Sequence, residues 1–192
     1  TSSDLSGELQ SSRFYRLVYM VFKGQHARDW FNGLPLNSTT ASYQIHSHHI
    51  FPKAYLAEHG WEEADLTQKK LINEIANRAF LTEKTNLAIS ASSPAEYLPQ
   101  IREQYPSALA AQCIPDDPSL WEAAQFQDFL DCRRKLIAEA INTHFKKLLE
   151  GNKYNREKEE QEVLIKLLNS DECETLEFKE TWHIDSFQSN RD

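Results

Sequence analysis

The chain has 192 residues, of which 40% are hydrophobic and only five are glycine, so it can bury one ordinary core and is neither fibrous nor disordered overall. Its formal net charge of −8 argues against a protein that coats nucleic acid by neutralising phosphates, although a bound metal or another domain could supply affinity for DNA. No apolar run approaches the ~20 residues that a membrane span requires, and residues 1–4 do not open a signal peptide.

The three cysteines, Cys113, Cys132 and Cys173, lie far apart and form no CxxC pair. This spacing indicates neither a disulfide framework nor a structural zinc ribbon, and it favours free thiols in a reducing cytoplasm. We therefore expect a cytoplasmic protein without a membrane partner. Because the sequence begins with Thr1 rather than Met, we also expect a fragment or a processed chain.

Hydrophobic periodicity predicts mainly helical structure in the first half of the chain, interrupted by two short extended segments. Apolar residues recur at helical spacing over 5–22, where Gly24 is the expected stop, and a helical turn is expected over 27–31. An extended segment over 43–51 ends before Pro52, since proline restricts the residue before it to β or polyproline geometry. Then follow a helical turn over 53–59, a helical or loop–helix segment over 65–76 and a short strand over 79–82.

The second half is predicted to be helical as far as about residue 150. Ser93 as N-cap, Pro94 at the first helical position and Glu96 at the third form a helix start. Helices over 98–111 and 119–150 follow, and a break is expected within the longer one. The stretch after it is dense in charge, which is typical of a solvated linker or helix face.

Three of the seven histidines, His46, His48 and His49, fall within four positions. Two adjacent imidazoles at the end of a short apolar strand project differently, so one can bind a divalent metal while the other takes a proton from water. Hydrolysis of a phosphodiester needs such a base together with a cation that stabilises charge on the phosphate. Because imidazole and side-chain oxygens suit a labile ion such as Mg²⁺ or Mn²⁺, the histidine pair and Asn86 could provide this set.

Together with two downstream segments, the histidine run resembles the core of an HNH, or ββα-metal, nuclease. The segments that carry the resemblance are His48-His49-Ile50-Phe51-Pro52, Asn77-Arg78-Ala79-Phe80-Leu81-Thr82 and Thr85-Asn86-Leu87-Ala88-Ile89-Ser90. The nine-residue step from Asn77 to Asn86 is similar to the spacing in the HNH domain of CRISPR effector nucleases of the Cas type. The resemblance implies a mainly α fold with an embedded ββα-metal hairpin and helix, and a metal-dependent endonuclease that acts on DNA.

The resemblance also implies a role for each residue of the motif. His49 is the expected general base, and His48 and Asn86 are the expected ligands of one Mg²⁺ or Mn²⁺ ion. Asn77 is expected to hold the loop through backbone hydrogen bonds. It and His49 are the two expected catalytic residues. The family more often has an acidic residue at position 48, and the imidazole of His48 shifts metal preference toward softer ions.

Four neighbours are candidates for supporting roles at the same site. His46 projects to the same side of the strand as His48, so it could bind the metal or support its ligands. Arg78 and Lys84 are candidates for contacts with the phosphates of the substrate. Ser90, about one helical turn beyond Asn86, could support the metal ligands by hydrogen bonding.

The flanking segments resemble a more particular family, the C-terminal nuclease half of GmrSD-type restriction proteins. The matching segments are Ala27-Arg28-Asp29-Trp30, His48-His49-Ile50-Phe51-Pro52-Lys53, Ile72-Asn73, Ala76-Asn77-Arg78, Asn86, Ile89-Ser90, Pro94-Ala95-Glu96-Tyr97-Leu98, Phe129-Leu130 and Arg133-Arg134-Lys135-Leu136-Ile137. The resemblance covers about 5–149 and implies restriction of foreign or modified DNA. It also implies control by a ParB/sulfiredoxin-like NTPase domain, N-terminal in the full protein or on a partner, and leaves open a homo-oligomer.

Near the C-terminus, Glu174-Thr175-Leu176-Glu177-Phe178-Lys179-Glu180 resembles the opening of AlbA/Schlafen-like DNA-binding domains. Too few residues follow to fold such a domain. The expected division is therefore an N-terminal helical segment (1–42), an HNH nuclease core (43–98), a C-terminal helical segment (99–150), a charged linker or helix (151–172) and the truncated start of a further domain or a tail (173–192).

Two other classes of function stay open. A catalytically inactive HNH-like module that binds DNA or a protein would fit the divergent ligand at His48 and the acidic composition. A metal-storage or metal-sensing protein would also use the histidine cluster, but its metal affinity would be indifferent to Asn86.

Outside the motif, aromatic and charged residues have structural interpretations. Trp30 and Trp121 are interpreted as core anchors rather than platforms for base stacking. Arg133-Arg134-Lys135 either contacts DNA or forms a solvated helix face with ion pairs to Asp128 or Asp131. The isolated histidines, interpreted as structural or solvent-facing, are His26, His59, His144 and His183.

Overall fold

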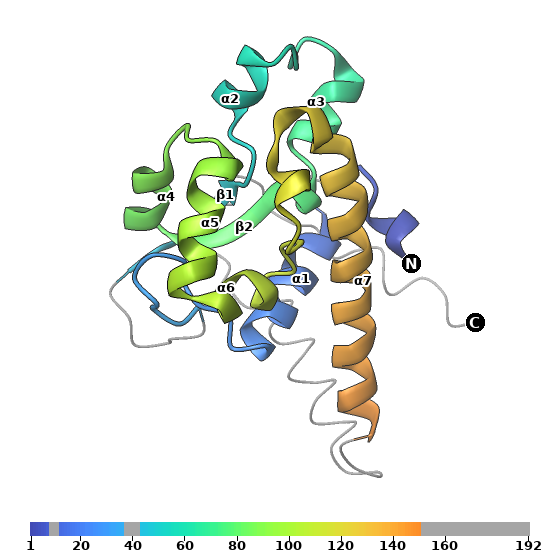
Figure 1. Ribbon diagram of the computed structural model, residues 1–192. Helices are drawn as coiled ribbons and strands as arrows, with labels where there is room; N and C mark the ends of the chain where they lie inside the picture. The colour runs from blue at the N-terminus through green and yellow to red at the C-terminus, as the bar shows by residue number, and fades with distance from the viewer. Residues whose placement is uncertain (8–11, 37–42, 151–192) are drawn as a thin grey trace, which may run out of the picture.

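The computed structural model describes residues 1–7, 12–36 and 43–150. In these residues the chain is mainly helical with one two-stranded antiparallel sheet, which confirms the prediction of a mainly α fold (Figure 1). The elements in chain order are the short 3-10 helix η1 (Ser2–Leu5), α1 (Arg13–Gly24), β1 (Ile45–His49), α2 (Lys53–Glu58), α3 (Leu66–Ile72), η2 (Ile75–Asn77), β2 (Arg78–Thr82), α4 (Glu83–Ile89), α5 (Pro94–Gln104), α6 (Pro106–Ala111), η3 (Pro118–Trp121), η4 (Ala123–Gln125) and α7 (Phe126–Glu150).

The sheet pairs β1 with β2 in a register that places His48 opposite Ala79 and His49 opposite Arg78. Successive side chains of a strand point to opposite faces, and directly opposed residues of an antiparallel pair share a face. His48 and Ala79 therefore lie on one face of the hairpin, and His49 and Arg78 lie on the other.

Each face of β2 is covered by its own hydrophobic cluster. Phe80 packs against three aromatic rings of α1 on the face that carries His49. Ala79 and Leu81 belong to a larger cluster in which Trp30 and Trp121 are buried, as predicted for core anchors. All five residues of β2 are buried, which explains why its three central residues are all apolar rather than alternating with polar ones.

Helix α7 runs along one side of the molecule and contributes to both clusters (Figure 1). Phe126, Phe129 and Leu130 in its first turns belong to the larger cluster. Ile137 and Ala140, farther along, belong to the cluster around α1. One long amphipathic helix thus holds together the two layers that enclose the hairpin.

Two predictions near the N-terminus were wrong. The helix expected over 5–22 begins only at Arg13, because η1 ends at Leu5 and Gly7 adopts a left-handed φ of 73°. No helix forms over 27–31. There the Asp29 carboxylate accepts hydrogen bonds from the backbone N–H groups of Phe31 and Asn32, at 3.0 Å each, and makes a side-chain-stabilised turn.

The second half follows the prediction more closely. The start at Ser93 is confirmed, since its hydroxyl accepts from the backbone N–H of Ala95 and Glu96 accepts from that of Ser93. The helix expected over 98–111 is instead two helices, because Pro106 cannot continue α5 and opens α6. The break expected within 119–150 lies at η3 and η4, before α7.

Several predictions fall outside the described residues: the polar loop over 37–42, the charged linker over 151–172, the tail over 173–192, Cys173 and His183. Cys113 and Cys132 are free thiols, as expected. Among the helices of the described ranges, none has both the length and the apolar character needed to cross a membrane.

Candidate active site

His48 and Asn86 meet on one face of the hairpin. Asn86 belongs to α4, which begins directly after β2. Nδ1 of His48 lies 2.9 Å from Oδ1 of Asn86, although 38 residues separate the two in sequence. Only 3% of His48 is exposed, and the rings of Trp30 and Tyr97 stand edge-on to its imidazole. Burial lowers the pKa of His48 to about 4, so the ring is neutral at pH 7.

In the structure these two atoms share a hydrogen bond, which the Nδ1–H of His48 donates because the amide oxygen of Asn86 can only accept. With the proton on Nε2 instead, both atoms would have lone pairs available for a divalent cation. Neutral imidazole nitrogen and amide oxygen are both metal ligands in proteins. Ligands in neighbouring positions of an octahedral ion, each about 2.1 Å from it, lie about 3 Å apart. His48 Nδ1 and Asn86 Oδ1 have nearly this separation, at 2.9 Å. No group of three His, Cys, Asp or Glu side chains gathers in the described part of the chain, so water and phosphate oxygens would have to complete the coordination.

His49 lies on the opposite face of the hairpin and has different partners. Its Nε2 lies 3.3 Å from Oδ1 of Asn73, the residue that follows α3. Burial, together with the positive charge of Arg78, lowers the pKa of His49 to about 2. The ring is therefore neutral at pH 7 and keeps one nitrogen lone pair, although so low a pKa makes it a weaker base than an ordinary histidine.

Asn77 ties together the two segments that carry these histidine contacts. Its side chain is fully buried and makes three hydrogen bonds to the backbone. Oδ1 accepts from the N–H of Phe51 at 2.8 Å, and Nδ2 donates to the carbonyls of Phe51 at 3.1 Å and Ile72 at 2.9 Å. The Asn77 carbonyl also accepts from the N–H of Ile50 at 2.9 Å. Asn77 thereby fixes the end of β1 against the end of α3.

The two predicted phosphate contacts differ in their surroundings. Arg78 is 9% exposed, and its Nη2 donates to Asn73 Oδ1 at 3.1 Å, so its guanidinium lies beside His49. Burial lowers the pKa of Arg78 to about 10, which still leaves the group charged at pH 7. Lys84 is exposed in the first turn of α4. Arg78 thus lies beside His49 in the structure, whereas Lys84 lies on the surface of α4.

The structure does not join His46 or Ser90 to the His48–Asn86 pair by a hydrogen bond. His46 shares a face with His48, but its buried Nε2 has no partner among the described residues. Ser90 is exposed and ends α4 with a φ of 51°. Its backbone N–H bonds the Asn86 carbonyl at 3.1 Å, and this contact serves the helix end rather than the Asn86 side chain.

Sequence patterns gave no indication that Asp29 supports the site. Its buried carboxylate accepts from the backbone N–H of Thr82 at 2.7 Å, the Thr82 hydroxyl at 2.9 Å and the Thr85 hydroxyl at 2.5 Å. These bonds fix the corner between β2 and α4, one residue before Asn86. The only signal in the sequence is that Asp29 belongs to the segment that resembles the GmrSD-type family.

The prediction for Arg133 and Arg134 needs correction, because neither lies on a solvated or DNA-binding face. Arg133 is fully buried, and its Nη1 donates to the Ala76 carbonyl at 2.8 Å. Arg134 forms an ion pair with buried Glu74, in which Nε lies 2.5 Å from Oε1, and a second pair with Asp131 as predicted. Both arginines therefore hold η2, and with it Asn77, against α7.

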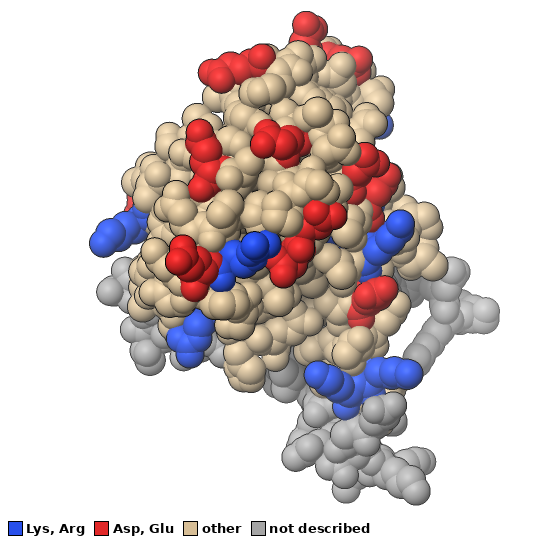
Figure 2. All heavy atoms as spheres, viewed as in Figure 1, with Lys and Arg blue, Asp and Glu red and all other residues tan. Residues whose placement is uncertain are grey.

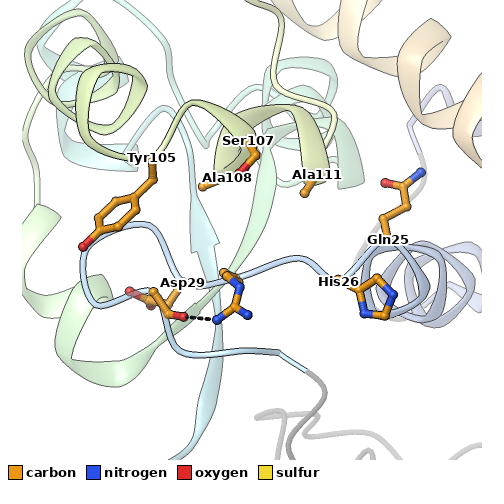
Figure 3. Close-up of a pocket in the computed structure, with 9 residues that line it drawn as sticks. Gln25, His26, Asp29, Tyr105, Ser107, Ala108 and Ala111 are labelled. Atoms are coloured by element: carbon orange, nitrogen blue, oxygen red, sulfur yellow. Dashed lines mark hydrogen bonds between the residues drawn. The ribbon is translucent and has the colours of Figure 1, made fainter.

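A separate hollow of about 280 Å³ lies between the segment after α1 and helix α6 (Figure 3). Gln25 and His26 line one side, Tyr105 and Ser107 line the other, and Arg28 is also among the lining residues. None of the sequence-predicted site residues lines this hollow.

On the face of the molecule shown in Figure 2, acidic side chains are scattered widely and basic ones are interspersed without a continuous patch. This distribution agrees with the net charge of −8.

What bears on function is thus the geometry around β1, β2 and α4, where residues distant in sequence converge. The chain matches no protein-family model, no curated protein and no solved structure.

Proposed function

We propose that the chain is a metal-dependent endonuclease of the HNH type that hydrolyses phosphodiester bonds of DNA. The observation that carries this proposal is the convergence of His48 Nδ1 and Asn86 Oδ1 to 2.9 Å on one face of the hairpin, with neutral His49 on the other. If the two adjacent histidines had no function, there would be no reason to expect a side-chain amide of helix α4 beside one of their rings. The buried Asn77 clamp supports the proposal, because it holds the loop as the resemblance implies.

The opposite orientation of the two histidines suits in-line displacement. In that reaction the attacking water and the leaving oxygen stand on opposite sides of the phosphorus. A phosphate at the end of β1 would have His49 on one side and the His48–Asn86 pair on the other. His49 would take a proton from the attacking water, and Arg78 beside it would donate hydrogen bonds to a phosphate oxygen. A divalent cation held by His48 and Asn86 would stabilise negative charge on the phosphate and the leaving oxygen.

The biological setting that we propose follows from the resemblance to GmrSD-type proteins. The substrate would be foreign or modified DNA, and an NTPase domain or partner would control cleavage. A net charge of −8 supplies no general attraction to DNA, and the face shown in Figure 2 carries scattered charges of both signs. Both observations support the proposal that another domain or partner brings the DNA to this chain.

The proposal is tested by nicking of a supercoiled plasmid with Mg²⁺, Mn²⁺ or Ni²⁺, and with EDTA as the control. Nicking that requires a metal is the expected result. Binding of DNA without nicking in any of these metals would instead support an inactive binding module. Tight metal binding that Asn86→Ala leaves unchanged would support a metal-storage protein.

A further inference from the structure

We infer that Asn73 is a positioning residue that holds His49 in one tautomer, with the proton on Nε2 and the lone pair on Nδ1. The inference rests on the proposed function, in which His49 is the general base. Asn73 is the C-terminal cap of α3, four residues before Asn77. Nothing in the family motif assigns it a role.

The orientation of the Asn73 amide is fixed by its own partners. Its Nδ2 donates to the Lys69 carbonyl at 2.9 Å and to Oε1 of Glu63 at 3.3 Å. Both of these partners can only accept a hydrogen bond. On the other side, Nη2 of Arg78 can only donate, and it lies 3.1 Å from Oδ1. Reversal of the amide would break all three contacts, so Oδ1 faces His49.

The amide orientation determines which nitrogen of His49 carries the proton. Oδ1 of Asn73 can only accept, and it lies 3.3 Å from Nε2 of His49. In a neutral imidazole one nitrogen donates and the other accepts, so Nε2 carries the hydrogen and Nδ1 keeps the lone pair. Within the described residues nothing hydrogen-bonds to that Nδ1, so it can receive a proton from water.

The same Asn73 oxygen also positions Arg78. It accepts from the guanidinium of Arg78 at 3.1 Å while it faces His49. Oδ1 of Asn73 therefore sets the distance between His49, the proposed base, and the guanidinium of Arg78, which would bind the phosphate. Removal of the Asn73 amide would release both groups at once.

Asn77 keeps this arrangement in place. It binds the backbone of Phe51, two residues after His49, and the carbonyl of Ile72, one residue before Asn73. A single buried amide thus fixes both sides of the contact between His49 and Asn73. This is the second reason to regard Asn73 as part of the site rather than as a helix cap alone.

The tautomer can be read directly from ¹⁵N-detected NMR of the histidine rings in the metal-free full chain. Wild type is expected to carry the His49 proton on Nε2. Asn73→Ala is expected to shift His49 to a mixture of tautomers, whereas Asn73→Asp, which keeps an oxygen acceptor, should retain the Nε2 proton. Glu63→Gln is the matched control, because it alters a partner of Asn73 without removing Oδ1, and it should leave the tautomer unchanged.

Nicking kinetics with Mn²⁺ provide the second readout. Asn73→Ala is expected to lower kcat by about 10- to 100-fold and also to raise KM, because it releases Arg78 together with His49, and Asn73→Asp should restore most of kcat. A wild-type His49 with its proton on Nδ1 would overturn the inference even if Asn73→Ala failed to fold. An unchanged tautomer and kcat in Asn73→Ala would overturn it as well. If wild type does not nick DNA at all, the proposed function fails, and the tautomer data alone then decide whether Asn73 orients His49.

Discussion

Asn77 binds both polar groups of the Phe51 backbone, accepting from its N–H at 2.8 Å and donating to its carbonyl at 3.1 Å. Side-chain amides can imitate a neighbouring strand in this way, because they carry a donor and an acceptor side by side. The pairing stabilises the chain just where β1 has ended, and it therefore determines where the preceding His49 lies.

Replacement of this amide should destabilise the fold. Asn77→Ala removes three buried hydrogen bonds and leaves the backbone groups of Phe51 and Ile72 without these contacts. The substitution should therefore lower the free energy of unfolding by about 3 kcal/mol. Urea denaturation measures the change. Asn86→Ala, which removes one hydrogen bond of a partly exposed side chain, should cost about 1 kcal/mol. An Asn77→Ala protein no less stable than Asn86→Ala would contradict the role of the clamp.

Metal affinity should depend on His48 and Asn86, the proposed ligands, and not on His46 in the same strand. His48→Ala and Asn86→Ala each remove a proposed ligand, and each should weaken Mn²⁺ binding by at least about tenfold. His46→Ala should leave the affinity nearly unchanged, since His46 makes no hydrogen bond to either ligand. Isothermal titration calorimetry of the three variants checks this pattern, and equal affinities would rule out the pair as the metal site.

Stability of the metal-free protein should fall as the pH drops from 7 to 4. The folded pKa values of His48, about 4, and His49, about 2, lie below the ordinary value of 6.5. In this window the unfolded chain binds more protons than the folded one, so acid favours unfolding. His48 alone should contribute a loss on the order of 3 kcal/mol between about pH 7 and about pH 4. Urea titrations in EDTA should show a shallower fall for His48→Gln, and an identical fall would show that His48 is not buried as a neutral ring.

The ion pair between Arg134 and Glu74 should matter far more than the one between Arg134 and Asp131. Glu74 is fully buried and would be left as an uncompensated charge, so Arg134→Ala should cost about 3–5 kcal/mol. Asp131 is largely exposed, and Asp131→Asn should change stability by less than about 1 kcal/mol. Thermal or urea unfolding distinguishes the two, and similar losses would contradict the burial of Glu74.

Local sequence signals predict the two strands because their causes are local, whereas the helix that carries Asn86 is implied by the resemblance. Pro52 predicts an end to the extended segment, and β1 ends shortly before it at His49, while the apolar centre of β2 agrees with burial on both faces. The resemblance, rather than a local signal, singles out Asn77 and Asn86, and in the structure both hydrogen-bond to the histidine run or to the residues just after it. The split at Pro106 also had a local signal, since a proline inside a helical pattern ends or kinks the helix.

The supporting residues could not be predicted because their partners are distant in sequence. Asp29 binds Thr82 across 53 residues, and Arg134 binds Glu74 across 60. A pair of arginines on a helix ordinarily indicates a solvated face, and only the packing of α7 against η2 reveals that Arg133 is buried. Asn73 likewise becomes visible only when α3 and β1 are brought together.

The central claim is tested most directly by the single-turnover nicking rate of wild type and His49→Ala in Mn²⁺. His59→Ala is the matched control, because His59 is an exposed histidine that bonds the carbonyl of Tyr55. The account predicts that His49→Ala lowers the rate by about 10²- to 10⁴-fold while Mn²⁺ affinity is retained, and that His59→Ala leaves the rate unchanged. Equal nicking rates for wild type and His49→Ala would contradict it.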